Sequence, residues 1–156
     1  MINLIGTYNC KLDAKNRVMI PASLKSQLHL FMNKGFVIKR SVFNTCLELY
    51  PMSEWIFMVD QVNKLNRFVK KNNDFIRSYT AGLRTLDIDS TGRILIPKDL
   101  TLFSGIKKNV VLTASLNMIE IWDQDQYESI VQETLTNFGE LAEEVMGQND
   151  RVDDVS

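Results

Sequence analysis

Two short motifs contain the residues best suited to bind another molecule. In each, an aspartate is followed four residues later by an arginine, at Asp13–Arg17 and again 76 positions downstream at Asp89–Arg93. Aspartate at the start of a turn accepts hydrogen bonds from nearby backbone amides, and the arginine guanidinium presents several donors to anionic or carbonyl oxygens. The two side chains could instead form only a surface salt bridge, which stabilises a protein by about 0–1 kcal/mol.

The motifs belong to a longer internal repeat. Both continue into a short apolar run that ends in a proline, Val18–Pro21 and Ile94–Pro97. Two further pairs of segments match downstream, Phe36–Ile38 with Val110–Leu112 and Leu47–Tyr50 with Ile119–Trp122. The offset between the copies falls from 76 to 74 to 72 residues, which places small insertions or deletions in the loops. The chain is therefore predicted to contain a duplicated unit of about 45 residues, joined by a helical connector.

Each motif is predicted to form the loop of a β-hairpin. Gly92 falls where such a loop commonly needs a positive φ, and Asn16, the next best residue for that conformation, takes the same position in the first copy. In the strand that follows the second loop, a period of two sends Ile94 and Ile96 to one face and Arg93 to the other. Both motif arginines should therefore point away from the core.

Short runs of β-branched and bulky apolar residues predict eight strands, four in each half of the chain. Their expected ranges are Gly6–Leu12, Arg17–Ile20, Gly35–Arg40, Thr45–Tyr50, Leu83–Ile88, Arg93–Ile96, Asn109–Thr113 and Asn117–Trp122. The proline after each motif is predicted to open a short helix. Ser53 is predicted to cap a longer helix that reaches Phe68, and Asn72–Asp74 should interrupt the chain before a second helix begins at Phe75.

The two halves are expected to depend on each other. Four short strands are about the minimum that can bury one face of a sheet, so neither half should be stable alone. We therefore predict that they interlock into one β-barrel around a pseudo-two-fold axis, with both arginine-bearing hairpins on the same side. The predicted fold class is mostly β with peripheral helices (α+β).

The distribution of charge is more informative than the net charge, which is −1. Residues 1–40 contain seven Lys or Arg and one acid, whereas residues 111–156 contain one base and eleven acids. A basic surface on the hairpin-bearing segments favours a polyanionic partner, and the acidic end is expected to be a solvated face.

The composition disfavours several classes of protein. No apolar stretch approaches the roughly 18–20 residues of a membrane span, and no secretory signal is recognisable, so we expect a cytoplasmic protein with no membrane partner. Cys10 and Cys46 with the single His29 are too few and too scattered for zinc. Asp87 and Asp89 lack a third ligand, and the sequence shows no nucleophile–base pair and no glycine-rich phosphate loop. We therefore predict no metal, no cofactor and no catalytic residue, and do not expect an enzyme.

The sequence closely resembles the MraZ family, bacterial transcription regulators built of two tandem SpoVT-AbrB repeats. The resemblance rests on the duplicated Asp-x-x-x-Arg motif with its apolar-apolar-Ile-Pro continuation, and on Leu47–Pro51 and Ile119–Trp122 downstream; it covers residues 4–137. It implies a duplicated swapped-hairpin β-barrel and assembly into rings. It also implies binding to short direct repeats upstream of the protein's own operon, the division and cell-wall gene cluster.

The resemblance also divides the chain and assigns residues. Residues 7–54 and 83–126 would be the repeats, 55–82 a helical connector, and 127–156 a C-terminal helix with an acidic tail. The DNA contacts carried over by position are Lys15, Arg17 and Arg93. With neighbours that could anchor the DNA backbone, the predicted DNA-binding set is Lys11, Lys15, Asn16, Arg17, Thr91 and Arg93. The residues predicted to shape the loops are Asp13, Asp89 and Gly92.

Two classes of function remain open. The first is a sequence-specific DNA-binding transcriptional regulator, cytoplasmic and nucleoid-associated, that binds double-stranded DNA as a ring-shaped homo-oligomer. The alternative is a ring-forming scaffold or protein-interaction module that presents its acidic C-terminal helix and reads no DNA. DNA binding predicts a steep salt dependence and a loss of affinity when the arginines are removed, whereas the scaffold predicts neither.

Overall fold

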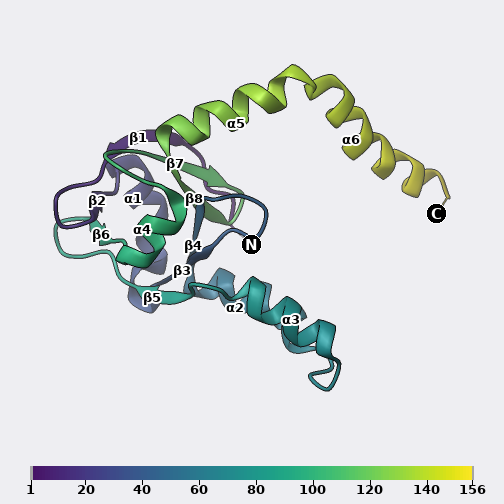
Figure 1. Ribbon diagram of the computed structural model, residues 1–156, viewed down its shortest axis with the longest axis horizontal. Coiled ribbons are helices and arrows are strands. Elements are labelled where there is room, and N and C mark those ends of the chain that lie inside the picture. Colours follow the sequence, from purple (N-terminus) through teal and green to yellow (C-terminus); the bar gives the residue numbers. More distant parts are fainter. Residues whose placement is uncertain (1, 156) are drawn as a thin grey trace. The chain divides into compact units, whose positions relative to one another are not determined.

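The computed structural model describes residues 2–155, with side chains described for residues 2–147. Residues up to Gln124 form one compact unit, and those from Asp125 onward form a second. The first unit is mixed α+β, with antiparallel sheets and short helices (Figure 1). Over residues 2–155, the structure contains no helix long and apolar enough to cross a membrane.

The eight strands lie where the apolar pattern predicts them, within a few residues at their ends. They are β1 (Thr7–Lys11), β2 (Arg17–Met19), β3 (Phe36–Arg40), β4 (Leu47–Pro51), β5 (Arg84–Leu86), β6 (Arg93–Leu95), β7 (Asn109–Ser115) and β8 (Met118–Asp123). The helices of the first unit are α1 (Ala22–Leu28), the 3₁₀ helix η1 (His29–Lys34), α2 (Met52–Asn63), α3 (Lys70–Tyr79) and α4 (Lys98–Ser104). Two further helices follow, α5 (Gln124–Thr136) and α6 (Phe138–Val155).

The strands form two antiparallel sheets. The larger has the order β1-β7-β8-β4-β3-β5, and β2 pairs with β6 in the smaller. The predicted β-barrel is not found as a closed barrel, because β1 and β5 remain at opposite edges of the larger sheet. The strands β2 and β6 are three residues long and pair with each other. An isolated antiparallel β-bridge between Leu12, directly after β1, and Val18 of β2 connects the two strands of the first hairpin.

Pairs of strands from different halves of the chain lie side by side in the larger sheet. At one edge β1 pairs with β7, with Tyr8 opposite Leu112. At the other edge β5 pairs with β3, with Arg84 opposite Ile38. In the centre β4 pairs with β8. Three of the five strand pairings in the larger sheet therefore link residues far apart in the sequence, while β3–β4 and β7–β8 join neighbouring strands.

Both halves contribute to one hydrophobic core. Val18 and Ile94 from the two motifs are fully buried, as are Leu24 in α1 and Leu100 in α4. The predicted alternation of the motif strands is confirmed, because Val18 and Ile94 are buried while the arginine before each of them lies on the other face of its strand. Burial of side chains of this size contributes roughly 1.5–3 kcal/mol each, which fixes the orientation of the strands.

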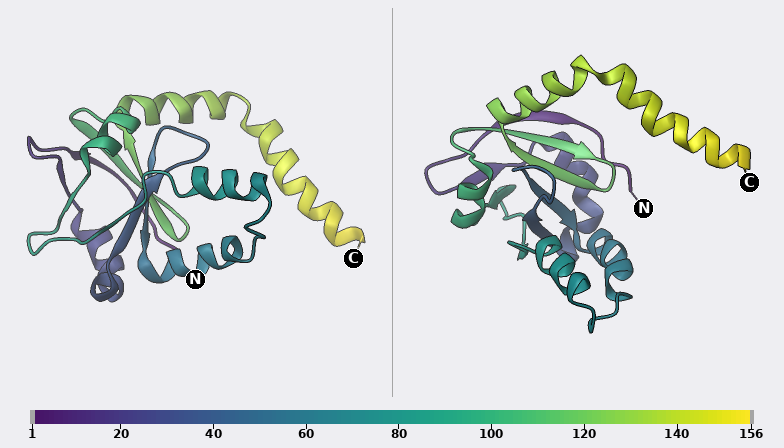
Figure 2. Two further views of the ribbon diagram at one scale, coloured as in Figure 1. Left: turned by 60° about the horizontal axis from the view of Figure 1, so that its bottom comes forward. Right: turned by 45° about the vertical axis from the view of Figure 1, so that its right-hand side comes forward.

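The connector consists of α2 and α3, which project from the sheet (Figures 1 and 2). Trp55 of α2 stacks on Tyr79 of α3, with 5.8 Å between the ring centroids, and lies 5.7 Å from the ring of Tyr50 in β4. These residues form a second, smaller apolar cluster with Val37. The connector is thus attached at its base, and its far end lies away from the core.

The first connector helix differs from the prediction at both ends. It begins at Met52, directly after Pro51, so the predicted Ser53 cap is wrong. Proline has no N–H to satisfy and a fixed φ, here −57°, which suits the position just before the first turn. The helix also ends at Asn63 rather than reaching Phe68, whose side chain is 99% exposed.

The predicted interruption at Asn72–Asp74 is also wrong, because all three residues lie inside α3. The two asparagine side chains do not break the helix, because their amides bond to the loop before it. The amide of Asn72 donates to the carbonyl of Asn66 at 2.9 Å, and the amide of Asn73 donates to the carbonyl of Arg67 at 2.7 Å. These bonds close the turn between the two helices.

Candidate nucleic-acid interface

The two Asp-x-x-x-Arg motifs form loops with the same backbone hydrogen bonds. The N–H of Asp13 donates to the carbonyl of Arg17 at 2.9 Å, and the N–H of Asp89 donates to that of Arg93 at 2.9 Å. The fourth residue of each loop has a positive φ, +62° at Asn16 and +84° at Gly92. The loops therefore present their side chains on matching frames.

The two aspartates act as acceptors within their own loops. Oδ1 of Asp13 accepts the N–H groups of Lys15 and Arg17 at 2.8 and 2.9 Å. The N–H of Arg17 is the largest cause of the lowered pKa of Asp13. This carboxylate is therefore ionised at neutral pH, and its first role is to shape the loop.

Asp89 has the same backbone bonds and one more partner. Its Oδ1 accepts the N–H groups of Thr91 and Arg93 at 2.9 and 3.0 Å, and the Thr91 hydroxyl at 2.7 Å. The N–H of Arg93 and then the Thr91 hydroxyl lower the pKa of Asp89 to about 2. A charged acceptor makes these bonds stronger than neutral ones.

The two arginines are held differently. Arg17 donates from Nε to Oδ2 of Asp13 at 3.0 Å, so the first motif does form a salt bridge. Arg93 instead donates from Nε to the Thr91 hydroxyl at 2.9 Å, and its nearest carboxylate oxygens, on Asp13 and Asp89, are both 3.9 Å away. The ion pair within the second motif is therefore long, and the hydrogen bond to the hydroxyl is the closer contact of its arginine.

The strands that follow the loops bring both arginines onto one ribbon. In the β2–β6 pair, Arg17 lies opposite Leu95, and Met19 lies opposite Arg93. The N–H of Ile20 donates to the carbonyl of Gly92 at 2.8 Å, which extends the pairing beyond β2. Met19 and Leu95 are 51% and 59% exposed, so the outer face carries two arginines and two apolar side chains. Figures 1 and 2 show both loops on the same side of the unit.

The structure also brings Lys25 to this site, to which the sequence assigned no role. A Cβ at Gly92 would lie 3.3 Å from Nζ of Lys25 and 3.6 Å from Sδ of Met19. Lys25 is in α1 of the first half, but it reaches the loop of the second half. The corresponding position in the second half is Thr101, so the match between the halves alone gave no signal of this contact.

The other predicted DNA-binding residues occupy two places. Lys15 is exposed in the first loop and Thr91 in the second, so both lie beside the ribbon. Lys11 lies at the end of β1 instead, opposite Asn109. There the N–H of Leu12 donates to the carbonyl of Lys108, so this end of the strand has a basic neighbour. Among the described residues, no group of three or more His, Cys, Asp or Glu could hold a metal ion.

Comparisons with known proteins show the family of the chain. The model of the MraZ protein family, described as antitoxin-like, matches residues 4–78 and 80–149, which is nearly the whole chain in two segments. The chain belongs to the MraZ family. Each matched segment contains one Asp-x-x-x-Arg loop, and so the family match and the internal repeat divide the chain at about the same place.

Several MraZ family members resemble the chain over most of its length. The protein named transcriptional regulator MraZ from Christiangramia forsetii is 58% identical over 156 residues, which is all of both chains. Its namesake from Flavobacterium psychrophilum is 57% identical over 147 residues, 94% of each chain. A more distant namesake from Pediococcus pentosaceus is 34% identical over 91% of this chain and 96% of its own. The MraZ family to which the chain belongs is thus one of transcription regulators.

Proposed function

We propose that this member of the MraZ family is a sequence-specific DNA-binding transcriptional regulator whose β2–β6 ribbon and adjoining loops contact double-stranded DNA. The observation that carries the proposal is the placement of Arg17 and Arg93, one from each repeat, on the same outer face of the ribbon, with 29% of each side chain exposed. The major groove of B-DNA admits a two-stranded ribbon, and arginine forms bidentate hydrogen bonds with guanine. Names of the relatives support a role in transcription.

The remaining predicted contacts have distinct roles in this proposal. Lys15 and Lys25 would neutralise phosphates beside the two loops, and the Asn16 side chain would bond to the sugar–phosphate backbone. Thr91 donates its hydroxyl proton to Asp89 and accepts a bond from Arg93, so it would act by orienting that arginine. Lys11, at the end of β1, would reach a phosphate further along the duplex. Phosphate contacts fix the orientation of a protein on DNA, so these residues would position the arginines.

The proposed fold is a swapped-hairpin arrangement with pseudo-two-fold symmetry, in which 7–54 and 83–126 are the repeats, 55–82 is the connector, and 127–156 is a helical, acidic end. The exchanged strand pairing supports it. Tyr8 pairs with Leu112, and their counterparts one repeat away, Arg84 and Ile38, pair with each other. At the centre of the sheet Glu48 pairs with Glu120, its own counterpart.

The protein is proposed to act in the cytoplasm, on the nucleoid, as a ring-shaped homo-oligomer at short direct repeats upstream of its own division and cell-wall operon. Its net charge of −1 supports an oligomeric mode, because a single chain has little attraction for DNA beyond its basic loops. Subunits on successive repeats can gain about 10²–10⁴ in avidity without any new kind of contact.

A scaffold that reads no DNA is the second candidate, and the acidic helices favour it. Residues 124–147 contain six Asp or Glu and no Lys or Arg, and several of their apolar side chains are exposed. Such a surface would engage a protein rather than a nucleic acid. This candidate predicts that neither salt nor the loop arginines affect the main interaction.

Titration on DNA probes with one, two or three copies of the upstream repeat, at several salt concentrations, tests the proposal. Affinity should rise steeply with repeat number, and each neutralised phosphate should add about −0.9 to the slope of log K against log salt. A probe with scrambled repeats is the control. Equal affinity for scrambled and native probes, or no dependence on salt, would favour the scaffold.

A further inference from the structure

The far end of the connector has a basic and apolar surface, which we call the connector patch. Arg67, Asn73, Ile76 and Arg77 line a shallow hollow there. Phe68 and Phe75, beside it in the sequence, are 99% and 52% exposed. Soluble proteins rarely leave large apolar side chains this exposed in groups, unless the surface binds something.

The connector patch is preorganised and positively charged. Nε of Arg67 donates to Oδ1 of Asn73 at 3.0 Å, which fixes the loop against α3. Residues 64–79 contain five Lys or Arg and one acid, Asp74. This acid accepts bonds from both Lys70 and Arg77 at 2.8 and 3.1 Å, so it offsets only part of the charge. Arg77 keeps 75% of its side chain exposed.

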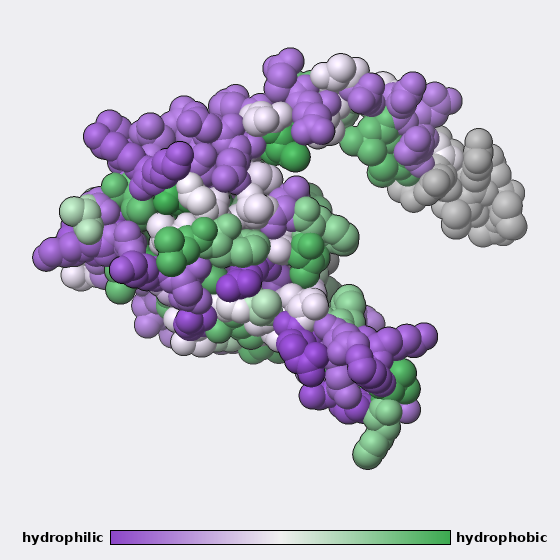
Figure 3. Space-filling view, viewed as in Figure 1, coloured by the Kyte–Doolittle hydropathy of each residue, from purple (hydrophilic) through white to green (hydrophobic). Residues whose placement is uncertain are grey.

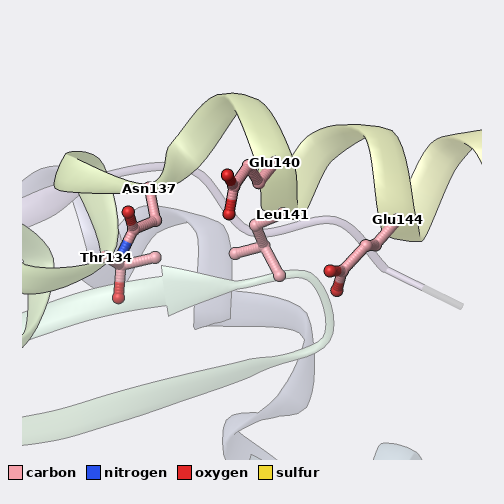
Figure 4. A pocket seen from close by; sticks show the side chains of 5 residues that line it. All are labelled: Thr134, Asn137, Glu140, Leu141 and Glu144. Atoms are coloured by element: carbon pink, nitrogen blue, oxygen red, sulfur yellow. The ribbon is translucent and has the colours of Figure 1, made fainter.

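A second surface, on α6, has the opposite charge. A hollow at the α5–α6 junction is lined by Thr134, Asn137, Glu140, Leu141 and Glu144. Figure 4 shows the carboxylates of Glu140 and Glu144 on the same helix as Leu141, one before it and one after it. We call this the acidic patch. Over residues 124–147, which contain it, the sequence has no base.

An apolar stripe on the same helix runs beside the acidic patch. Phe138, Leu141 and Val145 are spaced three and four residues apart, which places them on one face of the helix. They are 55%, 40% and 54% exposed. Figure 3 shows apolar surface among polar surface both on the connector and on the helices that follow residue 124. Each patch is thus an amphipathic helix face that remains exposed.

The two patches match each other in kind. In one, Arg67 and Arg77 flank an aliphatic residue, Ile76; in the other, two glutamates flank Leu141. We infer that the acidic patch of one chain docks on the connector patch of a second copy of the chain. Each patch repels its own kind, so the contact must join unlike surfaces. Contacts between unlike surfaces form closed rings when the rotation between subunits closes, and open filaments when it does not.

This inference rests on the proposed homo-oligomer but not on DNA binding. The connector and the loops are different parts of the first unit, and α6 follows them in the sequence. A subunit could therefore use the β2–β6 ribbon for DNA while both patches engage neighbouring subunits. Loss of one activity should leave the other measurable.

The test uses two charge-reversed, full-length variants. One carries Glu140→Lys with Glu144→Lys, and the other carries Arg67→Glu with Arg77→Glu. Each alone places like charges across the contact, so its dissociation constant for self-association should rise by at least about tenfold. An equimolar mixture should recover assembly, because each variant then offers a complementary patch to the other. Light scattering and sedimentation at low salt measure the masses.

Matched controls separate the patch from net charge. Glu128→Lys with Glu133→Lys changes two exposed acids of α5 by the same amount and should assemble like the wild type. Glu140→Gln with Glu144→Gln should weaken assembly less than the lysine pair, and circular dichroism confirms that each variant is folded. Binding of all variants to a single-repeat probe reports the DNA-binding proposal separately.

Three results would overturn the inference. Normal assembly of the arginine variant alone would show that the connector patch is not the partner surface. A mixture that fails to recover, with both variants folded, would exclude docking between copies through these patches. A monomeric wild type that still binds DNA would overturn the oligomer while leaving the DNA-contacting ribbon intact.

Discussion

The two loops share a backbone but differ in how their arginine is held. Arg17 is paired with the carboxylate of its own motif at 3.0 Å, whereas Arg93 is oriented by the neutral hydroxyl of Thr91 at 2.9 Å. The first loop contains Lys15, while the second has Lys25 brought to it from the other repeat. Duplication has thus kept the geometry of the site and varied its electrostatics. The two loops should therefore respond differently to equivalent substitutions.

Removal of the arginines should have the largest effect on DNA binding. Arg17→Ala and Arg93→Ala should each cost about 1–3 kcal/mol of binding free energy, with the larger loss at Arg17 because Lys15 lies beside it. Fluorescence anisotropy on a single-repeat probe measures the contact without the contribution of avidity. Lys64→Ala, which removes an exposed charge from the connector, is the matched control. Unchanged affinity in the double arginine variant would remove the ribbon from the interface.

Exchange of the residues with positive φ should affect the loops unequally. Gly92→Val forces a β-branched side chain into a φ of +84° and should destabilise the protein by about 1–3 kcal/mol. Gly92→Asn should be tolerated, since Asn16 already adopts +62° at the equivalent position. Urea denaturation followed by circular dichroism measures both changes. If valine and asparagine have the same effect, the two loops do not share a conformational requirement.

The Thr91 hydroxyl should matter through Arg93. It bonds to both Asp89 and Arg93, so Thr91→Val releases the guanidinium, whereas Thr91→Ser keeps both bonds. The valine variant should lose about 0.5–1.5 kcal/mol of DNA-binding free energy, and the serine variant should retain most of it. Anisotropy on the single-repeat probe distinguishes them. A loss in the serine variant with none in the valine variant would show that the methyl group, rather than the hydroxyl, supports the site.

The smallest expected effect concerns the titration of Asp89 in acid. Hydrogen bonds lower the pKa of Asp89 to about 2 from its ordinary value of 3.8, so the folded state favours its ionised form. The stabilisation this provides is present above the ordinary pKa and is lost as the pH falls through about 4 towards 2. Carboxyl chemical shifts followed by NMR should give this midpoint, and an Asp89 that titrates near 3.8 would contradict the bonding described.

Local pattern was sufficient to predict the strands but not the boundaries of the connector. In a strand, successive side chains point to opposite faces, so the apolar residues of Arg93–Ile96 that meet the core alternate with the others. This alternation can be read directly from the sequence. The course of α3 depends on bonds from Asn72 and Asn73 back to a loop that the sequence alone cannot position. Residues typical of turns therefore lie inside a helix, because their amides close the turn before it.

The contact between repeats was the part of the site that sequence reasoning missed. Arg17 and Arg93 could be identified because each repeats the other within a recognisable motif. Lys25 has Thr101, which is not basic, as its counterpart in the second repeat, and its contact with the second loop is not visible in the sequence of either half. The sequence also predicts a closed barrel, whereas β2 and β6 pair with each other in a separate sheet and leave β1 and β5 at opposite edges of the larger one.

The pairing of β2 with β6 has a consequence for how the protein is made. Arg17 lies opposite Leu95, so the first arginine-bearing strand cannot pair with β6 until the ribosome has synthesised the first part of the second repeat. Contacts so distant in sequence form late, because a long loop must close before they do. A nascent or truncated chain that ends before β6 therefore lacks the complete ribbon, and under the proposed function such a chain would not compete with complete copies for DNA.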